Sequence, residues 1–301
     1  MLHRVSPFEK DKLFPNENMK ISPEFLEKII LELKDKKYEI ISLDRLFQIL
    51  QNNEKVEKQI VFTLDDGYKD NYEIAYPIFK KYNVPFTIYI TTSFPEKSAV
   101  LWWYALEDFL ITKNEVTLSD GKKYICRTKQ EKTDTFMKIR EIIISFEPNA
   151  FLKKLNELFS NYCINWYKYS NELTMNWEDI QNLSQDEIVT IAGHTSNHFA
   201  LNRLSKDEIL KEVLDANQLI ESKIDKKINH FSYPFGSRNE IGTREFEIIK
   251  SLNFKTVTTT REGNVYHAHS SFMECIPRIM LTEKLKIDDI GKIRRKKMVT
   301  I

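Results

Sequence analysis

The 301-residue sequence predicts an α/β fold with a parallel β-sheet, either closed into a barrel or doubly wound. Short apolar segments rich in β-branched residues alternate with segments that have helical periodicity. One apolar segment, residues 60–64, lacks polar alternation, as expected of a strand buried on both faces. No predicted strand leads into a glycine-rich phosphate-binding turn. We therefore expect the functional side chains at the carboxyl ends of the strands.

The first half of the chain is expected to contain one complete strand–helix–strand unit. Before it, Ser22 is expected to cap a helix that begins at Pro23, and a short strand near residues 40–41 follows that helix. The unit itself comprises a strand over residues 60–64, a helix from about 71 to 81 and a strand over 86–91. Residues 1–5 are a candidate for an additional strand.

The alternation resumes in the second half of the chain. The expected elements are a strand over 188–192, a helix over 205–223, a strand over 231–233, a helix over 243–252 and a strand over 256–259. Ser205 and Glu208 have the spacing of a capping box, which fixes the beginning of the first of these helices.

A long segment, at about residues 97–175, separates the two halves. It contains a hairpin signal at Asp120-Gly121 and two helical stretches, and it is interpreted as an insertion. A barrel of this length is ordinary as one domain, so we expect residues 1–301 to form a single domain that carries this insertion.

Composition limits the classes of function. Hydrophobic residues make up 42% of the chain and charged residues 30%, which suffices for a full core. The net charge of +1 gives no broad basic surface for nucleic acid, and a neutral ligand suits it better. The three cysteines are too few and too scattered for a disulfide framework or a zinc knuckle.

Features of the chain's ends and apolar segments predict a cytoplasmic protein. The first residues lack the basic flank and apolar run of a secretory signal, and no segment approaches the roughly 18 apolar residues of a membrane span. Five of the six residues at 292–297 are basic. This cluster is interpreted as a solvated tail, with a peripheral contact to anionic lipid as the alternative.

Two motifs carry metal-binding chemistry. His194 and His198 are four residues apart directly after a predicted strand, so that both rings face one point if the loop turns helically. Asp65 and Asp66 end the strand with the clearest burial, where two adjacent carboxylates repel each other unless a cation or a proton compensates them. The two motifs together predict a metal site, whereas each alone also fits a polar turn or a helix cap.

Three motifs now reveal a resemblance. TLDDG at residues 63–67, HTSNH at 194–198 and FSYPFG at 231–236 look like the first three motifs of the polysaccharide deacetylase family, in the same order. Weaker similarity extends over most of the chain. The resemblance implies a distorted (β/α) barrel of about seven strands, and a hydrolase that removes the acetyl group from an N-acetylated sugar, such as a polysaccharide precursor or a carrier-linked saccharide.

The resemblance also implies the roles of individual residues. Asp66, His194 and His198 would hold one divalent ion, zinc in the first place, with cobalt, nickel or manganese as alternatives. Asp65 would be the general base, and the backbone N–H of Phe235 would stabilise the oxyanion. A divalent ion lowers the pKa of bound water to about 7, which agrees with hydrolysis of an amide.

The sequence departs from the family pattern at two roles. The third motif lacks the arginine that orients the base in many members, and Arg278, in a late predicted strand, is the candidate substitute, with a surface ion pair as its alternative. The late histidine that often acts as general acid is missing too. His3, His267 and His269 are the candidates for the acid, although each alone also fits an exposed bystander.

Substrate contacts and the reaction leave alternatives open. Tyr233 and Pro234 of the third motif, together with Trp103, are candidates for contact with the sugar, while the aromatic residues at 102–104 also fit a hydrophobic core. One alternative function is a catalytically silent saccharide-binding homologue. The other is an O-acetyl esterase, because an ester needs less help from an acid.

Overall fold

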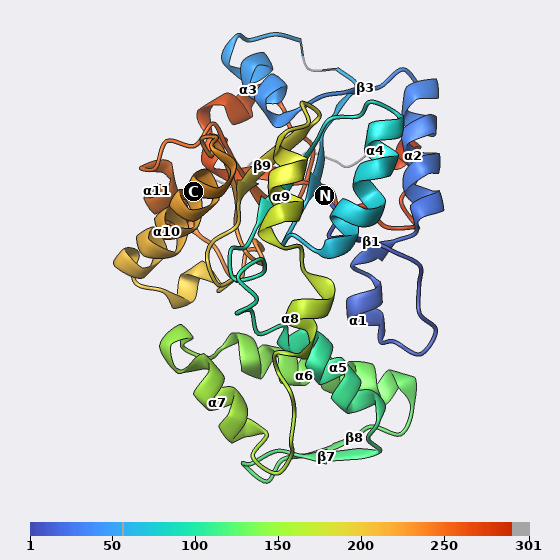
Figure 1. Cartoon of the computed structure of the whole chain (residues 1–301), viewed down its shortest axis with the longest axis vertical. Coiled ribbons are helices and arrows are strands. Elements are labelled where there is room, and N and C mark those ends of the chain that lie inside the picture. Colours follow the sequence, from blue (N-terminus) through green and yellow to red (C-terminus); the bar gives the residue numbers. More distant parts are fainter. Residues whose placement is uncertain (56, 291–301) are drawn as a thin grey trace.

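The computed structural model describes residues 1–55 and 57–290, and Figure 1 shows that these form a larger and a smaller part that follow each other along the longest axis. The larger part contains the main β-sheet with helices around it. The smaller part, below it in the figure, is built from the chain's middle third. The segment interpreted as an insertion, which we continue to call the insertion, forms a lobe at one end of the sheet-containing part.

The main sheet has six parallel strands in the order β12-β11-β10-β9-β6-β5. Its strands are β5 (Phe62–Leu64), β6 (Phe86–Ile90), β9 (Val189–Gly193), β10 (His230–Ser232), β11 (Thr256–Glu262) and β12 (Ile276–Arg278). The sheet is curled and flanked by helices, which confirms the predicted α/β fold with a distorted (β/α) barrel.

The first residues of the chain lie between the two edges of this sheet. The Leu2 N–H donates to the Thr63 carbonyl, and the Asp65 N–H donates to the Leu2 carbonyl, so the segment runs parallel to β5. On its other side, the Leu281 N–H donates to the carbonyl of Met1 over 2.8 Å. The segment thus bridges β5 and the chain just after β12, and it brings the following residue, His3, to the carboxyl end of the strands.

Most helices and strands confirm the sequence predictions. The elements of the sheet-containing part outside the main sheet are β1 (Arg4–Val5), α1 (Phe14–Glu17), β2 (Lys20–Ile21), α2 (Pro23–Asp35), β3 (Glu39–Ile40), α3 (Leu43–Gln51), β4 (Gln59–Ile60), η1 (Asn71–Ala75), α4 (Tyr76–Lys81), α9 (Trp177–Ser184), η3 (Leu201–Arg203), α10 (Lys206–Ile224), α11 (Thr243–Lys250), η4 (His267–Ser271), η5 (Met273–Cys275) and α12 (Ile287–Ile290). The caps predicted at Ser22 and Ser205 are present, because each side chain accepts a hydrogen bond from the third residue of its helix.

Two predicted elements differ in detail. The strand over residues 60–64 is split at Val61, because β4 pairs with β3 while β5 joins the main sheet. The helix over 71–81 begins with the π-helical segment η1, in which a wider turn precedes α4. Both differences arise from long-range pairing and packing, which local periodicity does not record.

The insertion has its own hydrophobic core and more helices than predicted. Its elements are α5 (Trp102–Ile111), β7 (Glu115–Thr117), β8 (Lys123–Ile125), α6 (Lys129–Ile144), η2 (Pro148–Ala150), α7 (Phe151–Leu158) and α8 (Lys168–Leu173). The hairpin at Asp120-Gly121 is confirmed, since β7 and β8 pair antiparallel on either side of it. The expectation of two helical stretches is wrong, because the segment contains four α-helices, and the two that were not expected, α7 and α8, are short and bury few residues.

A buried network connects the insertion to the sheet-containing part. Arg4 Nε donates to Asp70 Oδ2 over 2.7 Å, and Arg4 Nη1 donates to the Tyr104 hydroxyl over 3.1 Å. The guanidinium also lies 5.2 Å from the centre of the Tyr68 ring. Burial raises the pKa of the Asp70 carboxyl, although Arg4 opposes that shift. Asp70 therefore depends on Arg4 for compensation of its charge.

Replacing Arg4 by Met should lower the free energy of unfolding by about 3–5 kcal/mol, because the change leaves a buried carboxylate without its counter-ion. Urea denaturation measures this loss. Lys69→Met is the matched control, since Lys69 and its partner Glu73 are both exposed, and it should change stability by less than about 1 kcal/mol. Equal losses in the two variants would show that the Arg4 pair contributes no more than a surface pair.

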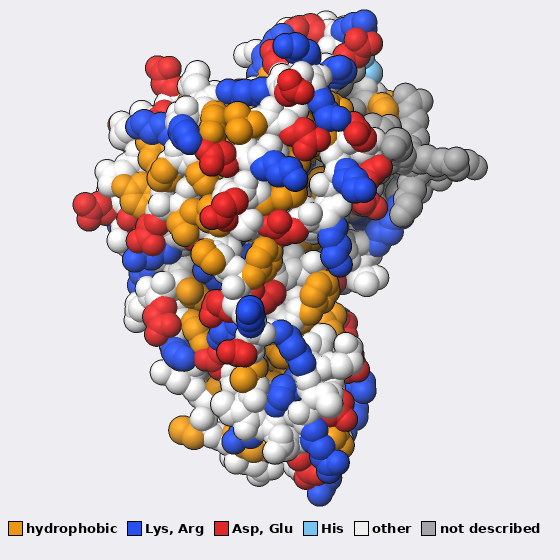
Figure 2. Space-filling view, turned by 90° about the vertical axis from the view of Figure 1, so that its right-hand side faces the viewer, with side chains coloured by type: hydrophobic (Ala, Val, Ile, Leu, Met, Phe, Trp, Pro, Cys, Tyr) orange, Lys and Arg blue, Asp and Glu red, His pale blue; other side chains and the backbone are white. Residues whose placement is uncertain are grey.

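The surface has mixed charge. Figure 2 shows Lys and Arg side chains interspersed with Asp and Glu over the displayed face, without a large patch of one sign. Among the described residues, no helix is both long and apolar enough to cross a membrane. The basic cluster at residues 292–297 lies outside the described residues.

Candidate metal centre

The two adjacent aspartates directly follow β5, where the chain makes a sharp turn. Asp66 has a φ of 79°, in the left-handed region that few non-glycine residues adopt, and Gly67 follows with a φ of 94°. Asp65 and Asp66 are 1% and 4% exposed. The turn sends the two carboxylates in different directions, so that each has a different set of partners.

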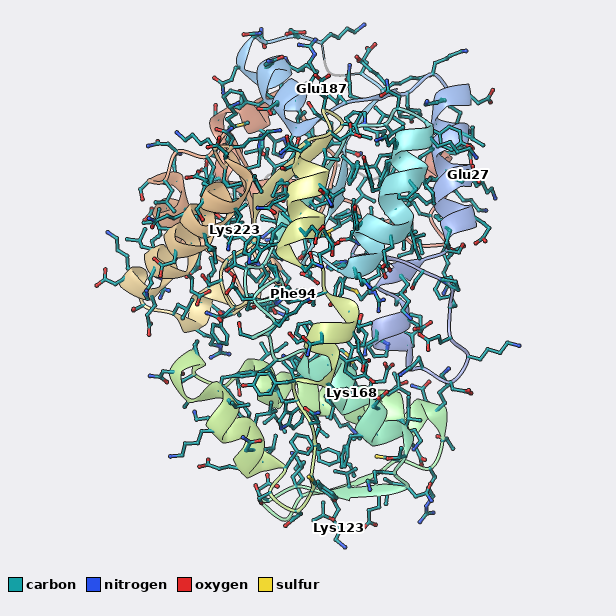
Figure 3. All side chains as sticks on the ribbon, in the orientation of Figure 1. Glu27, Phe94, Lys123, Lys168, Glu187 and Lys223 are labelled. Atoms are coloured by element: carbon teal, nitrogen blue, oxygen red, sulfur yellow. The ribbon has the colours of Figure 1, made fainter. Side chains whose placement is uncertain are left out.

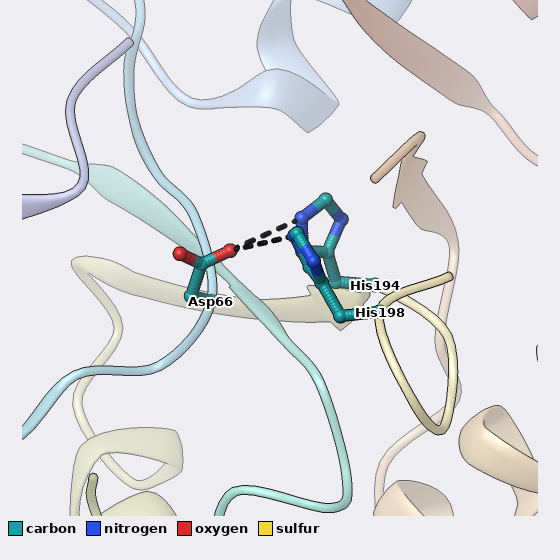
Figure 4. Close-up of side chains that lie close together, drawn as sticks. All are labelled: Asp66, His194 and His198. Atoms are coloured by element: carbon teal, nitrogen blue, oxygen red, sulfur yellow. Dashed lines mark ion pairs between the residues drawn. The ribbon is translucent and has the colours of Figure 1, made fainter. Parts of the chain in front are cut away.

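The two histidines follow β9 and meet Asp66 from the other side. His194 Nδ1 lies 2.7 Å from the Ser232 carbonyl, which requires the proton on Nδ1 and leaves the Nε2 lone pair free. The Nε2 atoms of His194 and His198 lie 3.3 and 3.2 Å from the same oxygen, Asp66 Oδ1. Figure 4 shows the two rings converging on this carboxylate.

These three side chains fit a divalent cation. One potential ligand atom from each lies within 4.8 Å of the other two. Asp66 Oδ1 is buried and accepts no hydrogen bond from a described residue, and the Nε2 lone pair of a neutral His194 would face it unfavourably. Burial alone would raise the pKa of Asp66, but His198 and His194 hold it well below its usual value. A cation between these atoms would satisfy all three, and two imidazoles with one carboxylate form a common open zinc site.

The other carboxylate, Asp65, forms a bidentate pair with Arg278. Arg278 Nη1 and Nη2 donate to Asp65 Oδ1 and Oδ2 over 2.6 and 2.7 Å. Arg278 is itself fixed by donation to the Thr259 carbonyl and the Ser232 hydroxyl. Burial alone would raise the pKa of Asp65, but Arg278 keeps it below its usual value. Asp65 is therefore ionised at neutral pH and held in one orientation.

Replacing Arg278 by Lys should lower kcat about 100-fold, because an ammonium retains the charge but not the planar pair of donors that orients Asp65. Metal affinity should change less than about threefold, since Arg278 forms no hydrogen bond or ion pair with Asp66, His194 or His198 in the described part of the chain and the lysine retains its positive charge. Steady-state kinetics beside metal titration checks both values. Wild-type kcat in this variant would show that Arg278 is not needed to orient Asp65.

The third motif brings the side chain of Phe235 beside His198. Phe235 has a φ of 58°, and its ring lies 4.9 Å from that of His198. Gly236 follows with a φ of 63°, and a Cβ there would lie 2.9 Å from the Thr260 nitrogen, so the position requires glycine. Within the described part of the chain, the Phe235 N–H donates no hydrogen bond.

The three histidines considered as acids lie in different places. His3 Nε2 is 3.9 Å from Asp65 Oδ2, and its Nδ1 is buried without a partner among the described residues. Burial lowers the pKa of His3, which Asp66 and Asp65 oppose. His267 Nε2 instead lies 2.7 Å from the Glu54 carbonyl, and His269 Nδ1 contacts Tyr266. The structure brings only His3 of these three to the carboxylates.

The candidate substrate contacts are also separated. Tyr233 is fully buried, and its hydroxyl donates to the Glu274 carbonyl. It faces away from the site because side chains alternate along a strand, and its neighbour Ser232 faces Arg278. Pro234 is buried as well. The partly exposed Trp103 lies nearer, with its ring centre 5.9 Å from that of His198.

One contributor escaped sequence reasoning. Tyr68, three residues after Asp65, accepts a hydrogen bond from Trp103 Nε1 over 3.1 Å and so holds this indole beside the site. Its position one residue after the acidic turn is the only signal in the sequence, and it does not distinguish a positioning residue from a core aromatic.

The fold and this centre define a class of protein: a distorted (β/α) barrel with an Asp-His-His centre that fits a metal, beside a second, oriented carboxylate. The family model described as polysaccharide deacetylase matches residues 52–121 and 148–257, more than half of the chain. The chain belongs to the polysaccharide deacetylase family.

Individual relatives agree with this assignment. A putative polysaccharide deacetylase of Bacillus subtilis, YxkH, is 45% identical over 42 residues, which span 14% of this chain and 15% of that protein. The deacetylase PplD of Streptococcus pyogenes, solved with acetate, is similar in fold with a TM-score of 0.66, at 18% identity and with coverage of 97% of this chain and 95% of that one. A de-N-acetylase of Aggregatibacter actinomycetemcomitans has a TM-score of 0.59, at 16% identity and 97% coverage of both chains.

Proposed function

We propose that this protein is a metal-dependent hydrolase that removes the acetyl group from an N-acetylated sugar. The observation that carries the proposal is the arrangement of the two adjacent aspartates: Asp66 faces His194 and His198, while Asp65 forms a separate bidentate pair with Arg278. One carboxylate is thereby available to a metal and the other to a proton. Membership in the deacetylase family supports the choice of bond.

The residues of the centre would divide the reaction among them. A divalent ion held by Asp66, His194 and His198, zinc in the first place, supplies a Lewis acid that activates water and polarises the acetyl carbonyl. Asp65, ionised and oriented by Arg278, takes the proton of the attacking water. The Phe235 N–H donates to the oxygen that becomes negative when the carbonyl carbon turns tetrahedral.

His3 is proposed as the group that protonates the leaving amine. Its Nε2 lies 3.9 Å from Asp65 Oδ2, so a movement of under about 1 Å brings the two atoms to hydrogen-bond distance and lets the proton collected by Asp65 be passed on. The lowered pKa of His3, caused first by burial, keeps the ring neutral and ready to accept that proton at neutral pH. The sugar then leaves as a neutral amine and the acyl group as acetic acid, whose remaining proton is lost to solvent to give acetate.

Replacing His3 by Gln should lower kcat for an N-acetyl substrate about 100-fold, within the range for loss of one acid–base group. The matching O-acetyl substrate should lose less than about threefold, because an alkoxide leaves more readily than an unprotonated amine. Rates of acetate release from the two substrates give the comparison. Equal losses would indicate that His3 acts through the fold or through Asp65 alone.

The test of the proposed function is acetate release from a panel of N-acetylated saccharides. Chelated protein is assayed with and without added Zn²⁺ or Co²⁺. Release that requires the metal would support the proposal, and release that persists in excess chelator would contradict it. A cytoplasmic precursor of a cell-surface polysaccharide, or a carrier-linked saccharide, is the expected source of substrate.

Two other functions fit parts of the same centre. An O-acetyl esterase would need no acid, and His3 would then have no effect on its rate. A catalytically silent saccharide-binding protein would bind metal and sugar without acetate release. The paired Asp65 favours hydrolysis over the silent form, because a protein that only binds has no use for a buried, oriented base.

A further inference from the structure

An apolar cleft opens beside the metal centre, between the sheet-containing part and the insertion. We call it the insertion cleft, and it is lined by Phe94 and Val100 before α5, Trp103 in α5, Phe146 and Phe151 around the start of α7, and Phe199 after β9, among others. Its volume is about 100 Å³. Figure 3 shows the labelled Phe94 at the junction of the two parts.

The insertion cleft is continuous with the proposed site. His198 and Phe235 both line it. His198 is also one of the proposed metal ligands, and Phe235 provides the proposed contact to the oxyanion. Trp103 forms the adjacent wall beside His198. A group bound in the cleft would therefore belong to the same molecule as the amide at the metal centre.

The lining has the chemistry of a hydrocarbon site. Aromatic and aliphatic side chains dominate it, and among the described residues that line it none is acidic and Arg203 is the only Lys or Arg. Asn197, one of its few other polar residues, already donates its amide to Glu212. A sugar ring buried here would leave most of its hydroxyl groups unpaired, which is costly.

The walls are held in place without a ligand. Trp103 Nε1 donates to the Tyr68 hydroxyl, and Tyr68 packs against Phe94 with ring centres 5.5 Å apart. On the opposite side, Phe151 of the insertion packs against Phe199 with ring centres 5.8 Å apart. A preformed apolar site needs little reorganisation when it binds an apolar group.

We propose that the insertion cleft binds an apolar aglycone, so that the substrate is an N-acetylated sugar linked to an alkyl or aryl group rather than a uniformly polar polysaccharide. This inference rests on the proposed function. If the substrate is an N-acetylated sugar, its acetyl group brings only one methyl to the site, so any further hydrocarbon in the cleft must come from another substituent of the sugar. The cleft volume is comparable to that of protein cavities that bind a small hydrocarbon.

The test compares methyl and octyl glycosides of N-acetylglucosamine, each below the concentration at which the octyl compound forms micelles. Each buried methylene is worth about fourfold in binding. With part of the chain in the cleft, kcat/KM for the octyl glycoside should exceed that for the methyl glycoside at least tenfold. Phe151→Ala should reduce this ratio below about threefold, whereas Tyr167→Ala, at an exposed aromatic of the insertion outside the lining, should leave it unchanged.

Val100→Phe provides a second variant, because it fills the cleft without removing an aromatic side chain from the insertion. It should lower the octyl rate more than the methyl rate and so reduce their ratio below about threefold. Calorimetric titration of both glycosides into Asp65→Asn protein repeats the comparison without turnover. Equal kcat/KM for the two glycosides would overturn the inference. So would an octyl preference that survives in both cleft variants. Acceleration by a longer N-acyl chain, rather than by the octyl group, would also overturn it. No acetate from any substrate, with octyl binding retained, would contradict the proposed function and leave the cleft assignment standing.

Discussion

Replacing Asp65 by Asn should lower kcat for acetate release about 10³- to 10⁴-fold, the upper range for removal of a general base. Asn has the same shape but cannot accept the proton of the attacking water. Asp66, His194 and His198 are unchanged, so the metal should still bind with an affinity within about threefold of the wild type. Steady-state kinetics and metal titration on the same preparation separate these two effects.

The variant also changes the environment of Arg278, and this provides a check on folding. Arg278 would lose its carboxylate partner while remaining buried, which should lower the free energy of unfolding by about 3–5 kcal/mol. Because the folded-state pKa of Asp65 lies below its unfolded value, the wild-type pair stabilises the fold above a pH of about 4, and this contribution is lost as pH falls through the folded-state pKa. The stability difference between Asp65→Asn and wild type should therefore shrink in acid.

If the Asp65→Asn protein is folded, binds metal and retains wild-type kcat, then Asp65 is not the general base. Asp186→Asn is the matched control: it changes an aspartate whose partners, Tyr76 and Lys80, lie on α4, and acetate release should be unchanged. A comparable loss of rate in this control would attribute the Asp65 effect to general destabilisation.

The sequence located the centre because local rules and parallel topology determine it. Asp65, Asp66 and His194 each follow an apolar strand, and parallel strands end at one edge of a sheet, so their proximity follows from the fold class. The strain of the loops is not visible in the sequence. Asp66, His198 and Phe235 all have positive φ, and such backbone strain is common at functional sites, but only the structure reveals it.

The partners of these residues depend on long-range register, which the sequence does not record. Arg278 is the sequence's candidate for orienting Asp65, with a surface ion pair as its alternative, and its pairing with Asp65 depends on the irregular register of β12 against β11. The same limit explains His3, which reaches the carboxylates because Leu2 pairs beside β5. Tyr233 shows the opposite outcome: its motif suggested the site, but strand alternation buries it.

The walls of the insertion cleft were the least accessible to sequence reasoning. Composition favours a hydrophobic core over a sugar platform for the aromatic residues at 102–104. The structure separates them, since Trp102 and Tyr104 are buried while Trp103 is partly exposed beside His198. Which face of a helix meets another part of the chain depends on how the insertion docks, and local periodicity cannot supply that.

The metal ligands themselves give the last prediction. Replacing His194 by Ala should abolish both metal binding and metal-dependent acetate release, with a loss of rate of at least about 10⁴-fold. Two ligands, Asp66 and His198, would remain, which is fewer than an open zinc site uses. The change also leaves the Ser232 carbonyl without its donor, so stability must be measured beside activity.

Thermal unfolding with and without Zn²⁺ provides a readout that does not depend on turnover. A ligand at about 100 times its Kd stabilises the folded state by about 2.7 kcal/mol, so Zn²⁺ should raise the Tm of the wild type, and that rise should vanish in His194→Ala. His230→Ala is the matched control, because its buried imidazole contacts Thr256 and Asp44 instead of the metal site, and the Zn²⁺-dependent rise should persist. A rise of equal size in His194→Ala and wild type would locate the bound metal elsewhere and remove the basis for assigning Asp66, His194 and His198 as its ligands.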